Sequence, residues 1–247
     1  MAQLAIIGGT GLTSLKNLEI IKREVVHTPY GEPSGPLVYG KFGDKEVMFL
    51  PRHGTGHTIP PHKINYRANL WALQENGASQ VIAVNAVGGI RGDMGPGVLV
   101  IPDQIVDYTW GRTNTFFEEG LESVVHIDFT EPYCGDLRQI LLKAGHSAGL
   151  MDIVNGGTYA ATQGPRLETA AEITRYERDG CHLVGMTGMP EAALARELGL
   201  CYASVAVVAN WGAGKGEGEI TMEAIEKCLD DGMRRVRTLL ENVSQHL

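Results

Sequence analysis

An asparagine closes an apolar stretch near the C-terminus, and its amide is a candidate for chemistry. The stretch 204-SVAVVANW-211 is rich in small and β-branched residues, which is typical of a strand buried on both faces of a parallel sheet. Ligands of such sheets bind at the carboxyl ends of the strands, where Asn210 would lie. Its amide can hydrogen-bond a ligand there. The alternative is that Asn210 only turns the chain toward Gly212.

A glycine turn near the N-terminus is a candidate phosphate site. The stretch 6-IIGGTGLTSL-15 leads from an apolar run into glycines whose backbone N–H groups, together with the Thr10 hydroxyl, can surround an anion. A dinucleotide-binding turn is the alternative. The third glycine of that motif is missing, so the match is partial.

The loop after another apolar run gathers basic side chains. In 51-PRHGTGHTIPPHK-63, Arg52 offers a donor fork that matches a phosphate, and His53 can donate to an anion or take up a proton. A zinc site is a weaker interpretation, because no cysteine or carboxylate accompanies the histidines and no helix aligns them. For His62 and Lys63 the alternative is a solvated basic loop.

Two more junctions offer contacts to an anion or a sugar. In 84-VNAVGGI-90 a strand ends in small residues, so the Asn85 and Ala86 amides can face a ligand. In 185-GMTGMPEAAL-194, Thr187 precedes a helix that begins at a proline, and the N-terminus of a helix favours anions. Plain turns and helix capping are the alternatives for these residues.

Strands and helices alternate along the chain and would position these groups. Apolar runs of strand length recur at residues 4–8, 46–51, 80–87, 97–106, 183–186 and 201–209. Helical periodicity predicts helices at residues 64–75, 135–148, 169–179, 190–198 and from 221 onward. The alternation predicts one α/β domain over residues 1–247, with helices on both faces of a doubly wound or mixed sheet.

Composition narrows the classes of function. The formal charge is -8, with 21 Lys and Arg against 29 Asp and Glu, and no basic run exceeds two residues, which argues against nucleic-acid binding. No apolar stretch approaches the length of a membrane span, and we expect a cytoplasmic protein. The four cysteines show no C-x-x-C spacing. We therefore expect reduced, mostly buried thiols rather than a metal site or a disulfide framework.

Taken in order, these junctions resemble the trimeric purine nucleoside phosphorylase and methylthioadenosine phosphorylase family. The matching stretches are 8-GGTG-11, 52-RHG-54, 85-NAVGG-89, 164-GPRLET-169, 185-GMTGMPE-191 and 207-VVAN-210. The resemblance implies a twisted mixed sheet, a homotrimer, and reversible cleavage of a purine nucleoside by inorganic phosphate. It also implies that no metal or organic cofactor takes part.

The resemblance assigns a role to each candidate residue. The implied phosphate ligands are Thr10, Arg52, His53, Asn85, Ala86 and Thr187. Met186 corresponds to the residue under the ribose, and Leu167 stands where many relatives carry a phenylalanine over the purine. Glu168 and Asn210 correspond to the two residues that read the base.

The base-reading pair resembles the branch of the family that acts on 6-oxopurines. The methylthioadenosine branch usually carries an aspartate at position 210, a second aspartate at 212 and a serine at 168, where this chain has Asn210, Gly212 and Glu168. A carboxylate accepts a hydrogen bond from N1–H of hypoxanthine, and adenine lacks that hydrogen. An amide donor at N7 and O6 stabilises the negative charge that develops on the departing base. The catalytic candidates are therefore Asn210 and His53.

The start of the last helix is expected to read the 5′ end of the sugar. Met222 and Ile225 would make this pocket apolar, which favours a methylthio group over a hydroxyl. His126 resembles a residue that the neighbouring subunit donates to this pocket. The alternative is that Met222 and Ile225 are ordinary core residues of the helix.

Together the two pockets predict phosphorolysis of 5′-methylthioinosine to hypoxanthine and 5-methylthioribose 1-phosphate. The alternatives within the enzyme class are a methylthioadenosine phosphorylase and an inosine or guanosine phosphorylase. Outside it, the chain could be a nucleoside-binding protein without turnover. A nicotinamide dehydrogenase is a further alternative, for which Glu24 is the only ribose reader the sequence offers.

Overall fold

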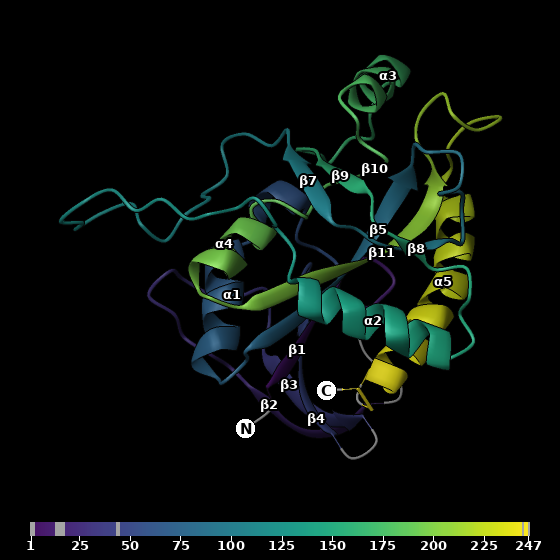
Figure 1. Ribbon diagram of the computed structural model, residues 1–247. Helices are drawn as coiled ribbons and strands as arrows, with labels where there is room; N and C mark the ends of the chain where they lie inside the picture. The colour runs from purple at the N-terminus through teal and green to yellow at the C-terminus, as the bar shows by residue number, and fades with distance from the viewer. Residues whose placement is uncertain (1–2, 13–17, 43–44, 244, 247) are drawn as a thin grey trace.

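A mixed sheet with helices on both faces forms the centre of the molecule (Figure 1). The computed structural model describes residues 3–12, 18–42, 45–243 and 245–246, and eleven strands in these ranges join one sheet. The strands are β1 (Leu4–Gly8), β2 (Glu19–Glu24), β3 (Leu37–Phe42), β4 (Lys45–Pro51), β5 (Gln80–Gly89), β6 (Leu99–Ile101), β7 (Gln104–Asp107), β8 (Val154–Asn155), β9 (Thr158–Ala161), β10 (Leu183–Gly185) and β11 (Cys201–Trp211). The helices are α1 (Tyr66–Glu75), α2 (Gly135–Ser147), α3 (Ala170–Arg178), α4 (Glu191–Glu197) and α5 (Met222–Val243), with a 3-10 turn at Pro61–Lys63.

The predicted fold class and all five predicted helices are confirmed. The predicted strand at 97–106 is instead two strands, β6 and β7, which are separated at Pro102. Proline lacks the N–H that a central strand must donate, so the break falls where the ladder could not continue. The sequence did not predict β2, β3, β8 and β9. All but the last residue of β2 are exposed, so it lacks the alternation that marks a half-buried strand.

The long strand β5 is the branch point of the sheet. Along one edge it pairs in parallel with β11 from Gln80 to Gly89. Along the other edge it pairs with β1 over residues 80–83 and, antiparallel, with β10 at residues 88–89. No strand in the described part of the chain pairs with residues 84–87 along that second edge. The sheet is therefore open at one point, between the ends of β1 and β10.

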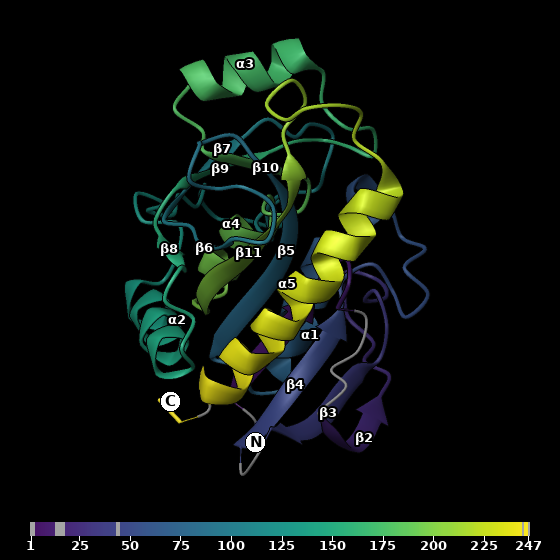
Figure 2. The same cartoon turned by 90° about the vertical axis from the view of Figure 1, so that its right-hand side faces the viewer.

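Two helical layers bury the two faces of the sheet (Figure 2). Side chains of α1 and α4, such as Leu70 and Leu194, pack with β11 residues Ala206 and Val208 on one face. The apolar side of α5 and helix α2 pack on the other face, where the cluster includes Val207, the neighbour of these residues in β11. Alternate residues of one strand thus serve opposite cores, which is the arrangement expected of a strand buried on both faces.

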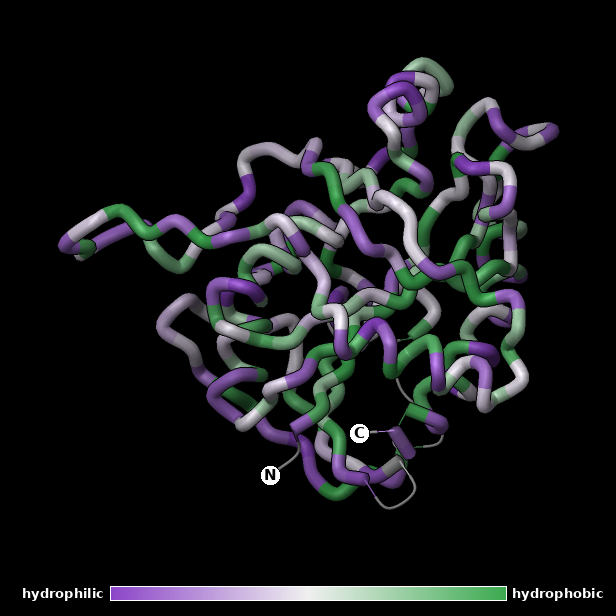
Figure 3. The backbone as a smooth tube through the Cα atoms, in the orientation of Figure 1, coloured by the Kyte–Doolittle hydropathy of each residue, from purple (hydrophilic) through white to green (hydrophobic). Residues whose placement is uncertain are grey.

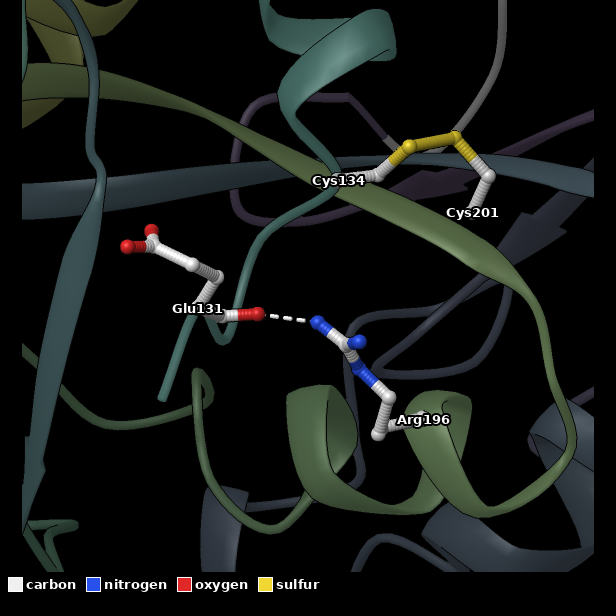
Figure 4. The surroundings of a disulfide bond; sticks show 4 residues. All are labelled: Glu131, Cys134, Arg196 and Cys201. Atoms are coloured by element: carbon white, nitrogen blue, oxygen red, sulfur yellow. Dashed lines mark hydrogen bonds between the residues drawn. A yellow bond between two sulfur atoms is a disulfide. The ribbon is translucent and has the colours of Figure 1, made fainter. Parts of the chain in front are cut away.

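Cys134 and Cys201 form a disulfide, which corrects the expectation that all four thiols are reduced. Their Cα atoms are 5.1 Å apart, and the two residues are separated by 67 positions in the chain. Figure 4 shows the bond between the start of α2 and the start of β11, near Arg196, which donates to the backbone carbonyl of Glu131. The other two cysteines, Cys181 and Cys228, are free thiols.

A long connection between β7 and α2 projects from the body of the molecule. Its tip, residues 119–127, is called the arm here and lies to the left in Figure 1. The arm carries exposed hydrophobic residues, including Leu121 at 42%, Val124 at 74% and Val125 at 43%, and hydrophobic stretches are visible along it in Figure 3. Among the described residues, no helix is long and apolar enough to cross a membrane.

Candidate active site

One cavity of about 400 Å³ lies where the carboxyl ends of β1, β4, β5, β10 and β11 meet. It lies at the open point of the sheet beside β5. Eleven of the predicted site residues line it: Thr10, Arg52, His53, Ala86, Leu167, Glu168, Met186, Thr187, Asn210, Met222 and Ile225. The predicted phosphate, base and sugar residues therefore come together, with two exceptions described below.

Arg52 follows β4 and enters the cavity from a fully buried position. Its Nε and Nη2 donate to the two carboxylate oxygens of Glu191 at 2.7 and 2.8 Å, and its Nη1 donates to the Val84 carbonyl at 2.8 Å. Burial opposes the charge of Arg52, but the adjacent Glu191 carboxylate outweighs this effect, and the pKa of Arg52 is raised. A guanidinium has five N–H groups, and hydrogen bonds to the described residues use three of them, which leaves two for a ligand.

His53 presents a neutral imidazole to the same cavity. Its Nδ1 lies 2.8 Å from the Ile59 carbonyl oxygen, which can only accept, so Nδ1 carries the proton. Burial, and then the nearby positive charge of Arg52, lower the pKa of His53 to about 4. The lone pair on Nε2 is then free to accept a hydrogen bond. The His57 ring lies beside it, tilted by 48° with ring centroids 4.6 Å apart, and also lines the cavity.

Thr187 reaches the cavity from the end of β10, but Asn85 does not line it. The Asn85 side chain is 1% exposed; its Nδ2 donates to Thr187 Oγ1 at 2.9 Å, and its Oδ1 accepts from Ser204 Oγ at 2.8 Å. This corrects the expectation that Asn85 is a direct phosphate ligand, because its amide is committed to two protein hydroxyls. The neighbouring Ala86 lines the cavity as predicted.

Glu168 is held by a residue that the sequence analysis missed. Thr162, 5% exposed at the end of β9, donates its hydroxyl to Glu168 Oε1 at 2.7 Å. That contact leaves Oε2 able to accept a hydrogen bond within the cavity. Leu167, beside it on the cavity wall, is 42% exposed.

A β-bulge turns Asn210 into the cavity. In the pairing with β5, Val208 lies opposite Val87 and Asn210 lies opposite Gly88, so Ala209 is an extra residue. The bulge reverses the alternation of faces, and Ala209 and Asn210 both line the cavity. A Cβ placed on Gly88 would lie 3.4 Å from Asn210 Nδ2, an ordinary contact, and 3.2 Å from Val184 Cγ1. Asn210 Nδ2 donates one hydrogen to the Trp211 carbonyl at 2.7 Å and retains a second.

Apolar side chains line part of the cavity, and an arginine outside its lining holds nearby backbone carbonyls. Met222 and Ile225 line the cavity from the start of α5; Met222 is 61% exposed, whereas Ile225 is also part of the core. Met186 lines the opposite part, and its carbonyl accepts from Arg112 Nη1 at 2.8 Å. Arg112 also donates to the carbonyls of Met189, Thr162 and Gln163. It therefore ties together the loops that carry Met186 and Glu168.

His126 lies on the exposed arm and does not line the cavity of its own chain. The sequence analysis placed this residue in the pocket of a neighbouring subunit, and that expectation stays a prediction.

Five supporting residues were missed in the sequence, namely Arg112, Thr162, Glu191, Tyr202 and Ser204. Tyr202 donates its hydroxyl to Glu191 Oε1 at 2.8 Å. Ser204 had the same signal as Asn210, a polar side chain within an apolar strand.

Within the described ranges, no cluster of three or more His, Cys, Asp or Glu residues could hold a metal ion.

Comparison with known proteins gives a consistent result. The family model described as "Phosphorylase superfamily" matches residues 3–245. A probable S-methyl-5′-thioinosine phosphorylase from Pseudomonas syringae pv. tomato is 55% identical over 98% of this chain and 98% of its own length. The 6-oxopurine nucleoside phosphorylase of Pyrococcus furiosus is 48% identical over 94% of this chain and 89% of its own length. A structure of methylthioadenosine phosphorylase from Schistosoma mansoni with adenine has a TM-score of 0.94 at 35% identity, covering 100% of this chain and 92% of that one.

Proposed function

The chain belongs to the phosphorylase superfamily, and from this premise we propose that it cleaves 5′-methylthioinosine with inorganic phosphate. The products are hypoxanthine and 5-methylthioribose 1-phosphate. One observation carries the proposal: the cavity combines Glu168 and Asn210 with the donors of Arg52 and with an apolar wall at Met222. The name of the relative from Pseudomonas syringae supports the same substrate.

Phosphate is held by charge and by hydroxyl and backbone donors. Hydrogen bonds to the described residues use three of the five N–H groups of Arg52, and Thr10, Ala86 and Thr187 line the same cavity. Neutral His53 accepts the O–H of monohydrogen phosphate at Nε2. A phosphate oxygen then forms a bond to C1′ as the bond from C1′ to the base nitrogen N9 breaks. The base takes the bonding electrons, and in the net reaction it gains the proton that the monohydrogen phosphate gives up, so the sugar product leaves as a phosphate ester without that proton.

Selection of the base depends on one acceptor and one donor. Glu168 Oε2 accepts N1–H of hypoxanthine, and Asn210 Nδ2 donates to N7 or O6 as charge develops there. Adenine offers no N1–H, so the Glu168 carboxylate would lack a partner, at a cost of about 1 to 3 kcal/mol. The name of the Pyrococcus furiosus relative, a 6-oxopurine nucleoside phosphorylase, fits this reading.

Selection of the sugar depends on burial of its 5′ substituent. Met222 and Ile225 offer contact to a methylthio group, whereas a buried hydroxyl without a partner costs about 1 to 3 kcal/mol in mutational data.

We also propose a homotrimer in which the arm of a neighbouring copy covers the exposed Met222 and brings its His126 to this wall. Analytical ultracentrifugation gives the oligomeric state. Substitution His126→Ala should raise the KM for the nucleoside and leave the KM for phosphate unchanged.

The proposal also includes a cytoplasmic enzyme that works without a metal or an organic cofactor. Protein disulfides are uncommon in reducing compartments, so the disulfide between Cys134 and Cys201 makes location a separate question. Cell fractionation tests the cytoplasmic location, and alkylation of free thiols tests whether the disulfide forms in the cell. Retained activity after dialysis against a chelator tests the absence of a metal.

The decisive experiment compares methylthioinosine, methylthioadenosine and inosine with and without phosphate. We expect hypoxanthine to appear from methylthioinosine with the highest kcat/KM and only when phosphate is present. Equal kcat/KM for all three nucleosides would contradict both pocket assignments. Release of no base at all would favour a binding protein, and hydride transfer to a nicotinamide would favour the dehydrogenase.

The substitution Asn210→Asp tests the base-reading amide directly. A carboxyl group can accept from the 6-amino group of adenine and deliver a proton to N7, so the ratio of kcat/KM for methylthioinosine over methylthioadenosine should fall tenfold or more, about 1.4 kcal/mol. The control is Asn242→Asp, on the α5 surface away from the cavity. An unchanged ratio in Asn210→Asp would remove this residue from base selection.

A further inference from the structure

We propose that Ser204 and Asn85 are positioning residues that force the Thr187 hydroxyl to donate its hydrogen to the bound phosphate. The inference rests on the proposed function and deepens it, because it explains why the Thr187 hydroxyl donates to the phosphate rather than accepting from another group. Ser204 lies in the middle of β11, at a distance along the strand from the residues that line the cavity.

The three side chains form one buried chain of hydrogen bonds. Ser204 Oγ donates to Asn85 Oδ1 at 2.8 Å, and Asn85 Nδ2 donates to Thr187 Oγ1 at 2.9 Å. Ser204 is 2% exposed, Asn85 1% and Thr187 7%, so bulk water has little access to the chain. The residues come from β11, β5 and the loop after β10, and only Thr187 lines the cavity.

The chemistry of each group sets the direction of the chain. An amide oxygen only accepts and an amide nitrogen only donates, so Thr187 Oγ1 accepts from Asn85 and its own hydrogen points elsewhere. Thr187 lines the cavity beside Arg52 and His53, where a phosphate oxygen would be the acceptor. A phosphate oxygen without a proton offers only lone pairs and therefore matches a hydroxyl held as a donor.

Ser204 selects one of the two orientations of the Asn85 amide. Among the described residues, the Ser204 hydroxyl makes a side-chain hydrogen bond only to Asn85 Oδ1. If the amide were rotated by half a turn, Asn85 Oδ1 would face Thr187 and accept its hydrogen, and the Ser204 hydrogen would lose its acceptor. The observed orientation gives the Ser204 hydrogen and both ends of the Asn85 amide a partner, and it leaves only the Thr187 hydrogen, at the cavity, for the ligand. Buried polar groups are rarely left unpaired, so this orientation is strongly favoured.

The substitution Ser204→Ala removes the group that selects the orientation. Asn85 Oδ1 is then buried without a donor, and rotation of the amide restores a partner by taking the Thr187 hydrogen. We expect the KM for phosphate to rise about tenfold, which corresponds to about 1.4 kcal/mol. The KM for the nucleoside should change less than twofold. The control is Ser79→Ala, an exposed serine next to β5, which should match the wild type.

A double-mutant cycle separates positioning from general damage. Thr187→Val keeps the shape of the side chain and removes the hydroxyl, so Ser204→Ala should raise the KM for phosphate less than twofold in that background. An equal rise in both backgrounds would overturn the proposal, since the effect of Ser204 would not pass through Thr187. An unchanged KM for phosphate in Ser204→Ala alone would also overturn it.

A second variant and a second readout keep the test independent of turnover and of folding in one mutant. Asn85→Asp has nearly the same shape but offers only acceptors, so it takes the Thr187 hydrogen and sets a negative charge near the phosphate. The increase in Tm caused by phosphate should be smaller in Asn85→Asp and in Ser204→Ala than in the wild type; equal increases would contradict the inference. If the wild type gains Tm with phosphate but releases no base, the proposed reaction fails while this test still applies.

Discussion

Replacing Glu191 by glutamine should destabilise the protein strongly, because it leaves the positive charge of Arg52 buried without a counterion. The two side chains are 0% and 1% exposed and share hydrogen bonds of 2.7 and 2.8 Å. Tyr202 donates to the same carboxylate at 2.8 Å. A glutamine offers one acceptor oxygen for these three donors and carries no charge. Removal of one partner of a buried ion pair costs about 3 to 5 kcal/mol, and we expect a loss in that range.

Urea unfolding followed by fluorescence measures this loss. Wild type and Glu191→Gln are compared at one protein concentration without phosphate, because ligands and subunit association add stability by mass action. The exposed substitution Glu226→Gln on α5 is the matched control and should change the free energy of unfolding by less than about 0.5 kcal/mol.

A double variant tests whether the buried charge causes the loss. Arg52→Met with Glu191→Leu removes both charges and fills similar volume, so it should be more stable than Glu191→Gln alone. It should have no phosphorolysis activity, because Arg52 supplies phosphate donors. A loss below about 1 kcal/mol in Glu191→Gln would refute the argument. A double variant as unstable as the single one would refute it too.

Two further predictions concern stability. The folded-state pKa of His53 is about 4, below its ordinary value of 6.5, so the unfolded chain binds this proton more readily. The contribution of neutral His53 to the free energy of unfolding is complete above pH 6.5 and is lost as the pH falls toward 4. The total loss is about 3 kcal/mol. The variant His53→Gln should lose less stability over that range, and an identical pH profile would contradict the pKa. The disulfide between Cys134 and Cys201 spans 67 positions, so reduction should lower the free energy of unfolding by about 4 kcal/mol in the chain-entropy account. The reductant should not affect the double variant Cys134→Ala/Cys201→Ala, and a wild type equally insensitive to it would contradict the stabilising role.

Sequence patterns predicted the elements whose burial is regular. The strands β1, β4, β5, β10 and β11 are apolar runs because both of their faces are covered, and α5 shows its stripe because one face packs on the sheet. The exposed strand β2 has no such pattern. Thr10, Arg52 and Thr187 could be singled out because each follows a predicted strand, whereas the strand before Glu168, β9, was not predicted.

Contacts between distant residues were not visible in the sequence. Arg52 and Glu191 are 139 positions apart, and no spacing rule relates them until the sheet brings β4 and α4 together. The same holds for the pairing of Cys134 with Cys201, since cysteine spacing alone does not give connectivity. Asn85 was assigned to the phosphate because it stands beside Ala86 in the stretch that resembles the family, but adjacent residues of a strand point to opposite faces.

The extra residue in β11 makes recognition depend on strand length as well as on side-chain identity. Regular pairing without the bulge would place Ala209 opposite Gly88 and Asn210 one position further along, where its amide would face the other side of the sheet. A protein engineer who transplants this nucleoside pocket to another parallel sheet must therefore copy an irregularity of the backbone, because the residues alone would face away from their ligand.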